Sequence, residues 1–403
     1  MTPNVRSSKS TCRIVFRMSA DLVPRLSTRP RVLHAVYSLG RGGAETQLSY
    51  LASGLSAGGW DVHIALLGDI AGSEINERRV RDAGVTLHRL PPAGNHDPRH
   101  VLRLRALIRR VDPHVVQTWL TMMDVFGGLA TLGDTRPWIM SERNAELSNV
   151  HSLKMGIRRL IARRASMVIA NSEAGRAQWS DLARGGTPTR CVRNALPHDE
   201  LAETKAIDRN SAGVPIADEL IVYAGRLEAQ KNIEGLLEAL ALVVAERNAT
   251  ALLFGKGDQD ALVDRFVEER RLQDRIVRMG FTTELWSFIK AADVFVSVSH
   301  FEGMPNTVME AMALGTPVVV SDTSPHREIC STEDALLVDR TNPPAIARAV
   351  TACLEETAAT RARIAAASSR AATWSIAAAA EQYDALYRSL LPTTAFAETD
   401  LSS

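Results

Sequence analysis

Short runs of apolar residues alternate with segments of helical periodicity along the first half of the chain. We expect helices at Ala44–Leu55 and Pro98–Arg110. Buried strands are expected at six runs: Arg31–Tyr37, Val62–Leu67, Val85–Leu90, Val115–Thr118, Trp138–Met140 and Met167–Ala170. Strands that alternate with helices are typical of βαβ units, so this half predicts a parallel sheet.

The same alternation begins again after a polar stretch at Ala202–Asp218. Strands are expected at Leu220–Ala224, Ala251–Phe254, Ile276–Met279, Val294–Val298 and Pro317–Val320, and helices at Asn232–Glu246, Asp258–Leu272 and Pro305–Leu314. The chain therefore predicts an α/β protein with two doubly wound, Rossmann-like domains. Ligands of such sheets bind at the carboxyl ends of the strands, so we expect them in a cleft between the two domains.

These patterns divide the chain into four parts. Residues 1–30 lack periodicity and are expected to form a flexible leader, with Met18 as an alternative start. Residues 31–204 form the first predicted domain and residues 205–375 the second. The Ala-rich end is expected to be helical over Pro343–Leu391, with residues 376–403 as a C-terminal helix and tail.

Charge separates the two predicted domains. Residues 1–200 contain 28 Lys and Arg against 17 Asp and Glu, whereas residues 201–403 contain 19 against 29. No run of about 18 apolar residues is present, so we expect no spanning helix. A secretory signal is not expected either, because Arg13 and Arg17 interrupt the only apolar stretch near the start of the sequence. The four cysteines are scattered without a C-x-x-C pair. This pattern argues against a disulfide framework and a cysteine-based zinc site, and it favours a reducing cytoplasm.

Charged residues follow two strands of the second predicted domain. In Ser299–Val320, Glu302 lies in the turn after a strand, and Glu310 lies about two turns along the next helix. Free N–H groups at a helix start suit a phosphate or a sugar ring. Arg226 and Lys231 follow another strand, where two cations can clamp a diphosphate. The alternatives are a solvated glutamate and a pair of surface cations.

Glycine-rich turns follow three more strands. Gly42 and Gly43 allow the backbone to approach a ligand closely. The turn at Phe254–Asp258 has the same strand–glycine–helix order, and Gly280 and Phe281 follow a strand with groups that suit a flat base. Each turn taken alone is equally consistent with a purely structural role.

Taken together, these turns resemble the family 4 retaining glycosyltransferases of the GT-B fold. This group 1 type is found in polysaccharide and lipid-linked glycan biosynthesis. The resemblance covers about residues 31–390 and is strongest in the second predicted domain. Its most specific mark is the spacing of Glu302 and Glu310, which have seven residues between them. Arg226 and Lys231 also match, and the turn at Gly42 resembles the family's N-terminal donor loop.

The resemblance implies a metal-independent hexosyltransferase that moves a hexose or aminohexose from a nucleotide-diphospho-sugar, with UDP the commonest nucleotide. The acceptor would be lipid-linked or a polysaccharide. The implied catalytic residues are Arg226 and Lys231, which would neutralise the diphosphate, and Glu302, which would contact the donor sugar. Donor binding would fall to Gly42, Gly43, Gly280, Phe281, Gly303, Met304 and Glu310. The nucleotide sugar is a substrate, so no cofactor is implied, and a front-face mechanism requires no protein nucleophile.

One segment departs from the family pattern. Many members carry His-x-His after a strand of the first domain, whereas this chain has Gln117-Thr118-Trp119. The role of the histidine is therefore not carried over. Trp119 is expected to pack rather than to stack on a sugar, and Asp124 is a candidate functional residue. Arg143 is expected either to contact an acceptor phosphate or to form a surface salt bridge.

The basic residues concentrate in two predicted amphipathic helices, Arg99–Arg110 and Leu153–Arg164. Such helices attract anionic lipids, so peripheral contact with the inner face of the plasma membrane is expected. The alternative is that their apolar faces belong to the core and their arginines are solvated. Nucleic acid is not an expected partner, because no recognition motif is present and aromatic residues make up 5% of the chain.

Two other functions fit the same architecture. A non-hydrolysing nucleotide-sugar 2-epimerase would form product without an acceptor, although the spacing of Glu302 and Glu310 argues against it. A non-catalytic nucleotide-sugar-binding protein is suggested by the missing His-x-His and would bind a donor without turnover. The residues themselves specify neither the nucleotide, the sugar nor the acceptor.

Overall fold

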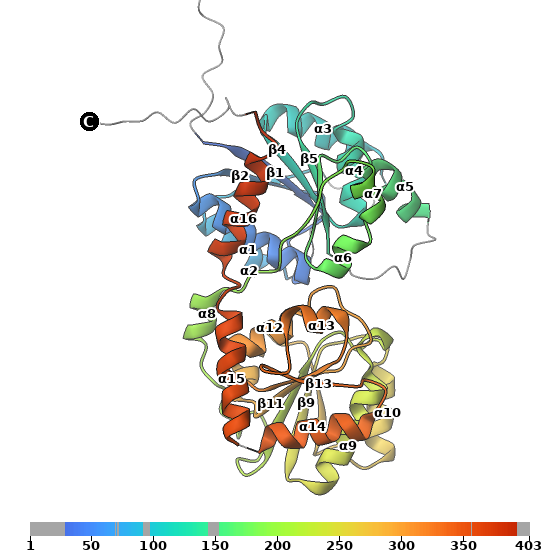
Figure 1. The fold of residues 1–403 in the computed structure, drawn as a ribbon, viewed down its shortest axis with the longest axis vertical. Coiled ribbons are helices and arrows are strands. Elements are labelled where there is room, and N and C mark those ends of the chain that lie inside the picture. The colour runs from blue at the N-terminus through green and yellow to red at the C-terminus, as the bar shows by residue number, and fades with distance from the viewer. Residues whose placement is uncertain are drawn as a thin grey trace, which may run out of the picture. The chain divides into compact units, whose positions relative to one another are not determined.

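The computed structural model describes residues 29–68, 70, 72–91, 97–143, 153–355 and 357–392. Within them, strands β1 to β13 form two separate parallel sheets, each flanked by helices (Figure 1). This arrangement confirms the predicted α/β class with two doubly wound sheets. The predicted leader, apart from its last two residues, and the predicted tail after residue 392 lie outside the described residues.

The first sheet has seven strands in the order β3-β2-β1-β4-β5-β6-β7, and all neighbours run parallel. Alternate residues of its central strand face opposite layers, with Val32 and Val36 in one apolar cluster and Leu33 and Ala35 in the other. Helices therefore cover both faces. The strands are β1 (Arg31–Val36), β2 (Asp61–Leu66), β3 (Thr86–Arg89), β4 (Val115–Trp119), β5 (Trp138–Glu142), β6 (Met167–Ala170) and β7 (Thr189–Cys191).

The second sheet has six parallel strands in the order β10-β9-β8-β11-β12-β13. The order reverses between β8 and β11, and ligands of open parallel sheets bind outside the strand ends at such a reversal. Both strands end where the sequence predicts charged site residues. The strands are β8 (Glu219–Ala224), β9 (Ala249–Phe254), β10 (Ile276–Gly280), β11 (Val294–Ser297), β12 (Val318–Ser321) and β13 (Leu336–Val338).

Helices connect the strands in both halves. The first eight are α1 (Gly43–Ala57), α2 (Glu74–Asp82), α3 (Arg99–Val111), α4 (Thr121–Ala130), α5 (Leu153–Ala162), α6 (Glu173–Ala177), α7 (Ser180–Arg184) and α8 (His198–Glu203). The others are α9 (Ile233–Glu246), α10 (Asp260–Glu269), α11 (Leu285–Ala291), α12 (Asn306–Ala313), α13 (Ser324–Ile329), α14 (Pro343–Leu354), α15 (Ala358–Ala371) and α16 (Ile376–Arg388). None of these described helices has the length and hydrophobicity needed to cross a bilayer.

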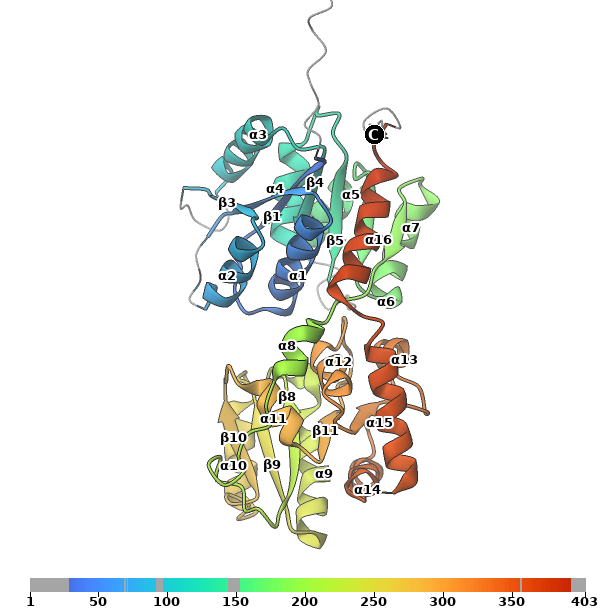
Figure 2. The ribbon, with the colours of Figure 1, turned by 90° about the vertical axis from the view of Figure 1, so that its left-hand side faces the viewer.

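The Ala-rich end forms three helices rather than the continuous one that its composition suggests. Asn342, Thr357 and Ser375 each precede one of them, and each side chain accepts a hydrogen bond from a first-turn backbone N–H. Side-chain caps of this kind mark helix starts inside a segment of uniform helix propensity. The breaks allow α14, α15 and α16 to take different directions (Figure 2).

The last helix returns to the first sheet. α16 packs against α1, and its Tyr383 and Tyr387 are buried in the same apolar cluster as Trp60. The chain therefore passes twice between the halves, once near Leu196 and once near Ser375, and these two residues form a β-bridge. The division of the chain at residues 204 and 375 stays a prediction.

Candidate functional site

Two of the predicted catalytic residues form an ion pair in the turns that follow β8 and β11. Lys231 ends a short 3₁₀ helix, η1 (Ala229–Lys231), and Glu302 lies between β11 and α12. Lys231 Nζ is 2.5 Å from Glu302 Oε1, and the side chains are only 15% and 8% exposed. The fold therefore holds one cation and one carboxylate together at the strand ends.

Buried hydroxyl groups fix the position of Glu302. Ser299 Oγ donates a hydrogen bond to Glu302 Oε1 at 2.7 Å, and Ser321 Oγ donates to the Ser299 carbonyl oxygen at 2.6 Å. Nδ1 of the buried His326 lies 3.0 Å from Ser321 Oγ. Burial lowers the pKa of His326 to about 4, so this imidazole is neutral near pH 7. No local sequence pattern marks Ser299, Ser321 or His326 as supports of this carboxylate.

Arg226 lies in a different environment from Lys231. Its side chain is 63% exposed and pairs with Glu228 at 2.6 Å. Among the described residues, no hydrogen bond or ion pair joins Arg226 to Lys231 or Glu302. Exposed ion pairs contribute little to stability, so Arg226 can exchange Glu228 for another anion at small cost.

Asn232 occupies the N-cap position of α9 without capping the helix through its side chain. Its backbone is left-handed, with φ of 54°, and its side chain makes no capping hydrogen bond. Instead, Asn232 Nδ2 donates to the carbonyl oxygens of Val298 and Arg340. The side chain therefore ties the Lys231 turn to the end of β11.

Helix α12 continues directly from the Glu302 turn and includes Glu310. Met304, predicted to lie near the donor, is only 8% exposed and packs in the apolar core, which leaves the backbone at Gly303 as the accessible part of this turn. Glu310 is half-buried. Burial raises the pKa of Glu310 to about 7, against the smaller opposing effect of a hydrogen bond with Trp286 on α11.

Glycines allow the predicted donor turns to approach other backbone closely. A Cβ on Gly255 would lie 1.8 Å from the Gly225 carbonyl oxygen, so the turn after β9 packs directly on the turn that leads to Arg226. Gly280 is left-handed, with φ of 71°, which favours glycine at the end of β10. The ring of Phe281 that follows is 59% exposed.

The predicted donor loop of the first half contacts the second half at two places. The Arg41 guanidinium carbon lies 5.0 Å from the centre of the Phe281 ring. Gly42 is the N-cap of α1, and a Cβ on Gly43 would lie 2.9 Å from Asn306 Nδ2 on the first turn of α12. The loop before α1 therefore contacts Phe281 through Arg41 and the start of α12 through Gly43.

The segment that replaces His-x-His is entirely buried. Gln117 donates to Ser141 Oγ and accepts from Tyr387, and Trp119 Nε1 donates to Nδ1 of His34 at 3.2 Å. The side chains of residues 117–119 are 0% exposed. The prediction that Trp119 packs is therefore confirmed, and none of the three side chains is accessible to a ligand.

Asp124 belongs to a buried ion network instead of a ligand surface. Arg158 lies 2.7 Å from both Asp124 and Glu142, and all three side chains are at most 3% exposed. Burial raises the pKa of Asp124 to about 6, while Arg158 opposes that rise. The expectation of a solvated basic face on Leu153–Arg164 is therefore wrong for Arg158. The buried carboxylates that hold it come from α4 and β5.

Arg143 takes part in no salt bridge among the described residues, and its contact with an acceptor phosphate stays a prediction. Its guanidinium donates to Asn194 Oδ1 at 3.0 Å and to the Tyr383 hydroxyl at 2.7 Å, and it lies 4.1 Å from the centre of the Trp119 ring. Asn194 Nδ2 in turn donates to Asn306 Oδ1 at 2.7 Å. A polar chain therefore runs from the end of β5 to the start of α12, and the sequence analysis missed Asn194 and Asn306.

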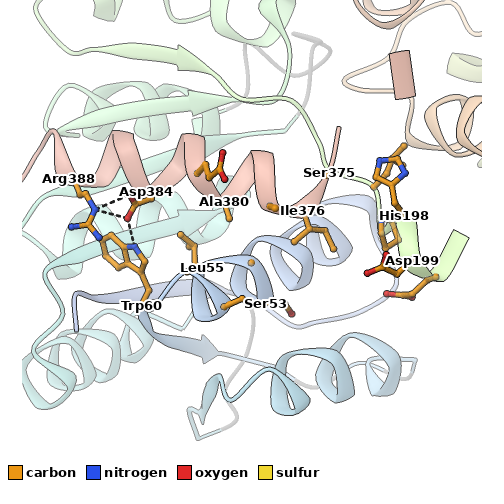
Figure 3. Close-up of a pocket in the computed structure, with 18 residues that line it drawn as sticks. Ser53, Leu55, Trp60, His198, Asp199, Ser375, Ile376, Ala380, Asp384 and Arg388 are labelled. Atoms are coloured by element: carbon orange, nitrogen blue, oxygen red, sulfur yellow. Dashed lines mark hydrogen bonds and ion pairs between the residues drawn. The ribbon is translucent and has the colours of Figure 1, made fainter. Parts of the chain in front are cut away.

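A groove of about 710 Å³ lies between α1 and α16, away from every predicted site residue (Figure 3). Leu55, Trp60 and Ile376 form apolar parts of its wall. Asp384 accepts hydrogen bonds from the Trp60 indole and from Arg388 at one end. His198 and Ser375 line the other end, where the chain passes between the halves.

Two facing α/β halves, with charged turns and a helix start at the strand ends of the second, define a GT-B type of enzyme. The family described as glycosyl transferases group 1 matches residues 204–370, and glycosyltransferase family 4 matches residues 41–200. The two matches cover both sheets, and the chain belongs to the group 1 glycosyltransferases of GT-B fold.

Curated relatives carry names from glycan biosynthesis. In Campylobacter jejuni, the N-acetylgalactosamine-N,N'-diacetylbacillosaminyl-diphospho-undecaprenol 4-alpha-N-acetylgalactosaminyltransferase is 25% identical over 343 residues, which cover 80% of this chain and 89% of the relative. An uncharacterized glycosyltransferase of Methanocaldococcus jannaschii is 34% identical over 157 residues, or 38% of this chain. That match spans only 40% of the archaeal relative's length.

Solved structures share the fold over nearly the whole chain. Anabaena HepE in complex with UDP and glucose has a TM-score of 0.77 and 22% identity, covering 90% of this chain and 100% of that one. Sucrose-phosphate synthase from Thermosynechococcus elongatus has a TM-score of 0.74 and 20% identity, covering 90% and 99%. At these identities the likeness establishes the fold alone.

Proposed function

We propose that this chain transfers a hexose or aminohexose from a UDP-sugar to a lipid-linked or polysaccharide acceptor, with retention of the anomeric configuration and without a metal ion. The observation that carries the proposal is the buried pair of Lys231 and Glu302 beside the first turn of α12. A cation, a carboxylate and a helix start together suit a sugar diphosphate. The UDP complex of HepE and the diphospho-undecaprenol in the Campylobacter name support the choice of donor and acceptor.

Lys231 is assigned to the charge that develops on the diphosphate as the sugar departs. Its ammonium group is held by Glu302 and the buried turn, so it needs little reorganisation during the reaction. Arg226 turns from Glu228 to the diphosphate and adds a second cation. Positive charge from these side chains replaces that of a metal ion, and a front-face reaction requires no protein nucleophile.

Glu302 and Glu310 are assigned to hydroxyl groups of the donor. Glu302 keeps one oxygen on Lys231 and Ser299, so Oε2 remains for hydroxyls of the transferred sugar. Glu310, further along α12, accepts hydrogen bonds from the ribose. Gly42 and Gly43 approach the diphosphate from the first half, and Gly280 and Phe281 hold the base.

Peripheral membrane contact is part of the proposal. Leu160 on α5 and Leu102 on α3 are 64% and 68% exposed, although both are large apolar residues. Arg163 and Arg164 follow α5, Arg109 and Arg110 end α3, and all four are exposed. Helix α4 packs against both helices, so these residues belong to neighbouring elements. Exposed leucines beside arginines suit the cytoplasmic face of an anionic membrane, where a lipid-linked acceptor is located.

The first test is binding of UDP-, GDP-, ADP- and dTDP-hexoses, followed through the melting temperature. A ligand that binds the native state raises this temperature by mass action. Transfer is then measured with the nucleotide sugar that binds and a polyprenyl-diphospho-sugar acceptor, with and without EDTA. NMR of the product reports its anomeric configuration. An inverted product contradicts retention, and loss of activity with EDTA contradicts the metal-free reaction.

Lys231→Ala tests the catalytic assignment. We expect kcat to fall about 10²- to 10³-fold, because a charge aimed at the transition state is lost, while donor affinity changes much less. Lys290→Ala serves as the control, since it removes an exposed lysine whose side chain, within the described part of the chain, donates to the Thr204 carbonyl oxygen alone. A loss of donor affinity with unchanged kcat would assign Lys231 to uniform binding. A wild type that binds donor without turnover would favour a binding protein, and product without acceptor would favour an epimerase.

A further inference from the structure

The first residue of α12 is bonded to the first half of the chain through two side-chain amides. Arg143 Nη1 donates to Asn194 Oδ1 at 3.0 Å, and Asn194 Nδ2 donates to Asn306 Oδ1 at 2.7 Å. Asn194 is only 5% exposed. The side-chain amide of Gln47 on α1 bonds both the backbone N–H and the carbonyl oxygen of Ala195. These two bonds fix the backbone next to Asn194.

The direction of this chain of hydrogen bonds is fixed by chemistry. A guanidinium only donates, so Asn194 must turn its oxygen to Arg143 and its NH₂ group to the other side. Asn306 must then turn its oxygen to Asn194. Its own NH₂ group is therefore directed away from Asn194.

Arg143 is held firmly enough to impose this direction. Its second nitrogen donates to the Tyr383 hydroxyl at 2.7 Å, and the guanidinium lies 4.1 Å from the centre of the Trp119 ring. Tyr383 is 3% exposed and Trp119 is 0% exposed. Arg143 itself is half-buried, and these buried neighbours hold its guanidinium in the orientation that donates to Asn194.

The NH₂ group of Asn306 faces the glycine turn before α1. A Cβ on Gly43 would lie 2.9 Å from Asn306 Nδ2, and the described residues supply no hydrogen-bond acceptor for this nitrogen. The next residue, Thr307, donates to the carbonyl oxygen of Ala224, which ends β8 just before the Arg226 turn. The amide of Asn306 therefore lies near both turns assigned to the diphosphate, the glycine turn of Gly42 and Gly43 and the turn after β8 that holds Arg226.

We propose that the Asn306 NH₂ group donates a hydrogen bond to a diphosphate oxygen of the donor. Asn194 is the positioning residue that directs this NH₂ group, under the control of Arg143. The inference rests on the proposed function. The Asn306 amide thus adds a neutral hydrogen-bond donor to the cations Lys231 and Arg226. Residues of the first half determine whether this amide turns its NH₂ group or its oxygen toward the diphosphate.

Two isosteric variants separate this role from packing. In Asn306→Asp, the carboxylate still accepts from Asn194 but presents an anion to the diphosphate. In Asn194→Asp, the carboxylate accepts from Arg143 and also from Asn306, so the Asn306 amide rotates and presents its oxygen to the diphosphate. We expect UDP to bind about ten- to hundredfold more weakly to both variants, as for a lost charge-assisted hydrogen bond.

Two comparisons separate a direct effect on the diphosphate from a general disturbance of the site: UDP affinity in a double variant, and affinity for uridine. In an Asn306→Ala background, Asn194→Asp should weaken UDP binding further by less than about twofold, because no amide remains to rotate. Uridine, which lacks the diphosphate, should bind equally to wild type and all variants. UDP is followed by calorimetry and uridine by ligand-observed NMR. Asn342→Asp, the same change at the cap of α14, is the matched control and should leave both affinities unchanged.

The outcomes distinguish the inference from the function on which it rests. Equal UDP affinity of wild type and Asn194→Asp overturns the inference, and so does an equal loss in both backgrounds. A parallel loss of uridine affinity also overturns it, since it indicates general disruption of the site. A wild type that binds UDP, GDP, ADP and dTDP with no measurable affinity overturns the proposed function, and the inference with it.

Discussion

Lys231 and Glu302 bond each other, so a diphosphate that binds Lys231 meets an ammonium group with a carboxylate already in place. The ammonium group has three donors, and one is directed to Glu302 at 2.5 Å. The remaining donors can reach a phosphate oxygen without breaking the pair. The ion pair therefore orients Lys231 and keeps its ammonium group in the same position when the nucleotide leaves the site.

Glu310 makes donor binding depend on pH. Its raised pKa of about 7 leaves much of the carboxyl protonated at pH 6, whereas ribose hydroxyls are bound best by the ionised form. Affinity for a UDP-sugar, whose diphosphate does not titrate in this range, should therefore rise as the pH increases from 6 to 8. Well below pH 7 the change approaches about tenfold per pH unit. Calorimetry at several pH values measures it.

Glu310→Gln is the control for this titration. The amide cannot ionise, so the variant should bind weakly and show a flat profile between pH 6 and 8. Binding to the wild type at pH 7 should also release protons, which calorimetry detects through the ionisation enthalpy of the buffer. An unchanged slope in the variant would assign the titration to another group.

At the scale of elements, the ion network of Arg158 joins α5 to α4 and β5. Removing one member of a buried network leaves the others as uncompensated charges. Arg158→Ala should lower the free energy of unfolding by about 3–5 kcal/mol, as measured by urea denaturation. Arg159→Ala, one residue further on α5, removes an exposed pair with Asp181 and should cost about 1 kcal/mol or less. Similar losses in the two variants would contradict a special role for the buried network.

The helices and strands that could be predicted from the sequence are those whose apolar residues recur at a clear helical or strand spacing. The strands that lead to the candidate site were all located to within two residues at either end, because each is rich in apolar residues and is followed by a polar or glycine-containing turn. The three-residue strands β7 and β13 are too short to show a period, and they were missed. The Ala-rich end has uniform propensity, so its helix breaks depend on single capping residues.

Site residues were predicted where local sequence carried the signal. Lys231, Glu302 and Glu310 follow strands or begin helices, and their spacing is itself informative. Asn194 and Asn306 are separated by 112 residues and are ordinary polar residues in their local segments. The burial of Arg158 was unpredictable for the same reason, since Glu142 and Asp124 come from other elements. Contacts between distant segments are set by packing, which one sequence does not display.

At the scale of the whole molecule, the exposed leucines of α3 and α5 should govern membrane contact. Leu102→Ser combined with Leu160→Ser should reduce binding to phosphatidylglycerol vesicles several-fold, since about 0.8 kcal/mol is lost per CH₂ that no longer enters the bilayer. Binding to phosphatidylcholine vesicles should be weak for both proteins. Cosedimentation measures the bound fraction, and added salt should lower it by screening the arginines.

A matched substitution separates the leucines of this surface from exposed leucines in general. Leu242→Ser changes a leucine on α9 of the second half that is 43% exposed. It should leave vesicle binding unchanged. Equal binding by the wild type and the Leu102/Leu160 double variant would contradict the proposed membrane surface.

The return of α16 to the first sheet has a consequence for biosynthesis. A ribosome releases residues 31–191, which contain all seven strands of the first sheet, long before it releases Tyr383 and Tyr387. Until then, the wall formed by Trp60 and Leu55 lacks its covering helix. The second half, by contrast, has all its strands by residue 338 and the last residue of its apolar core at Ala371. The half that is encoded second can therefore complete its core first, and the nascent first half must wait for α16 with an apolar surface open to chaperones.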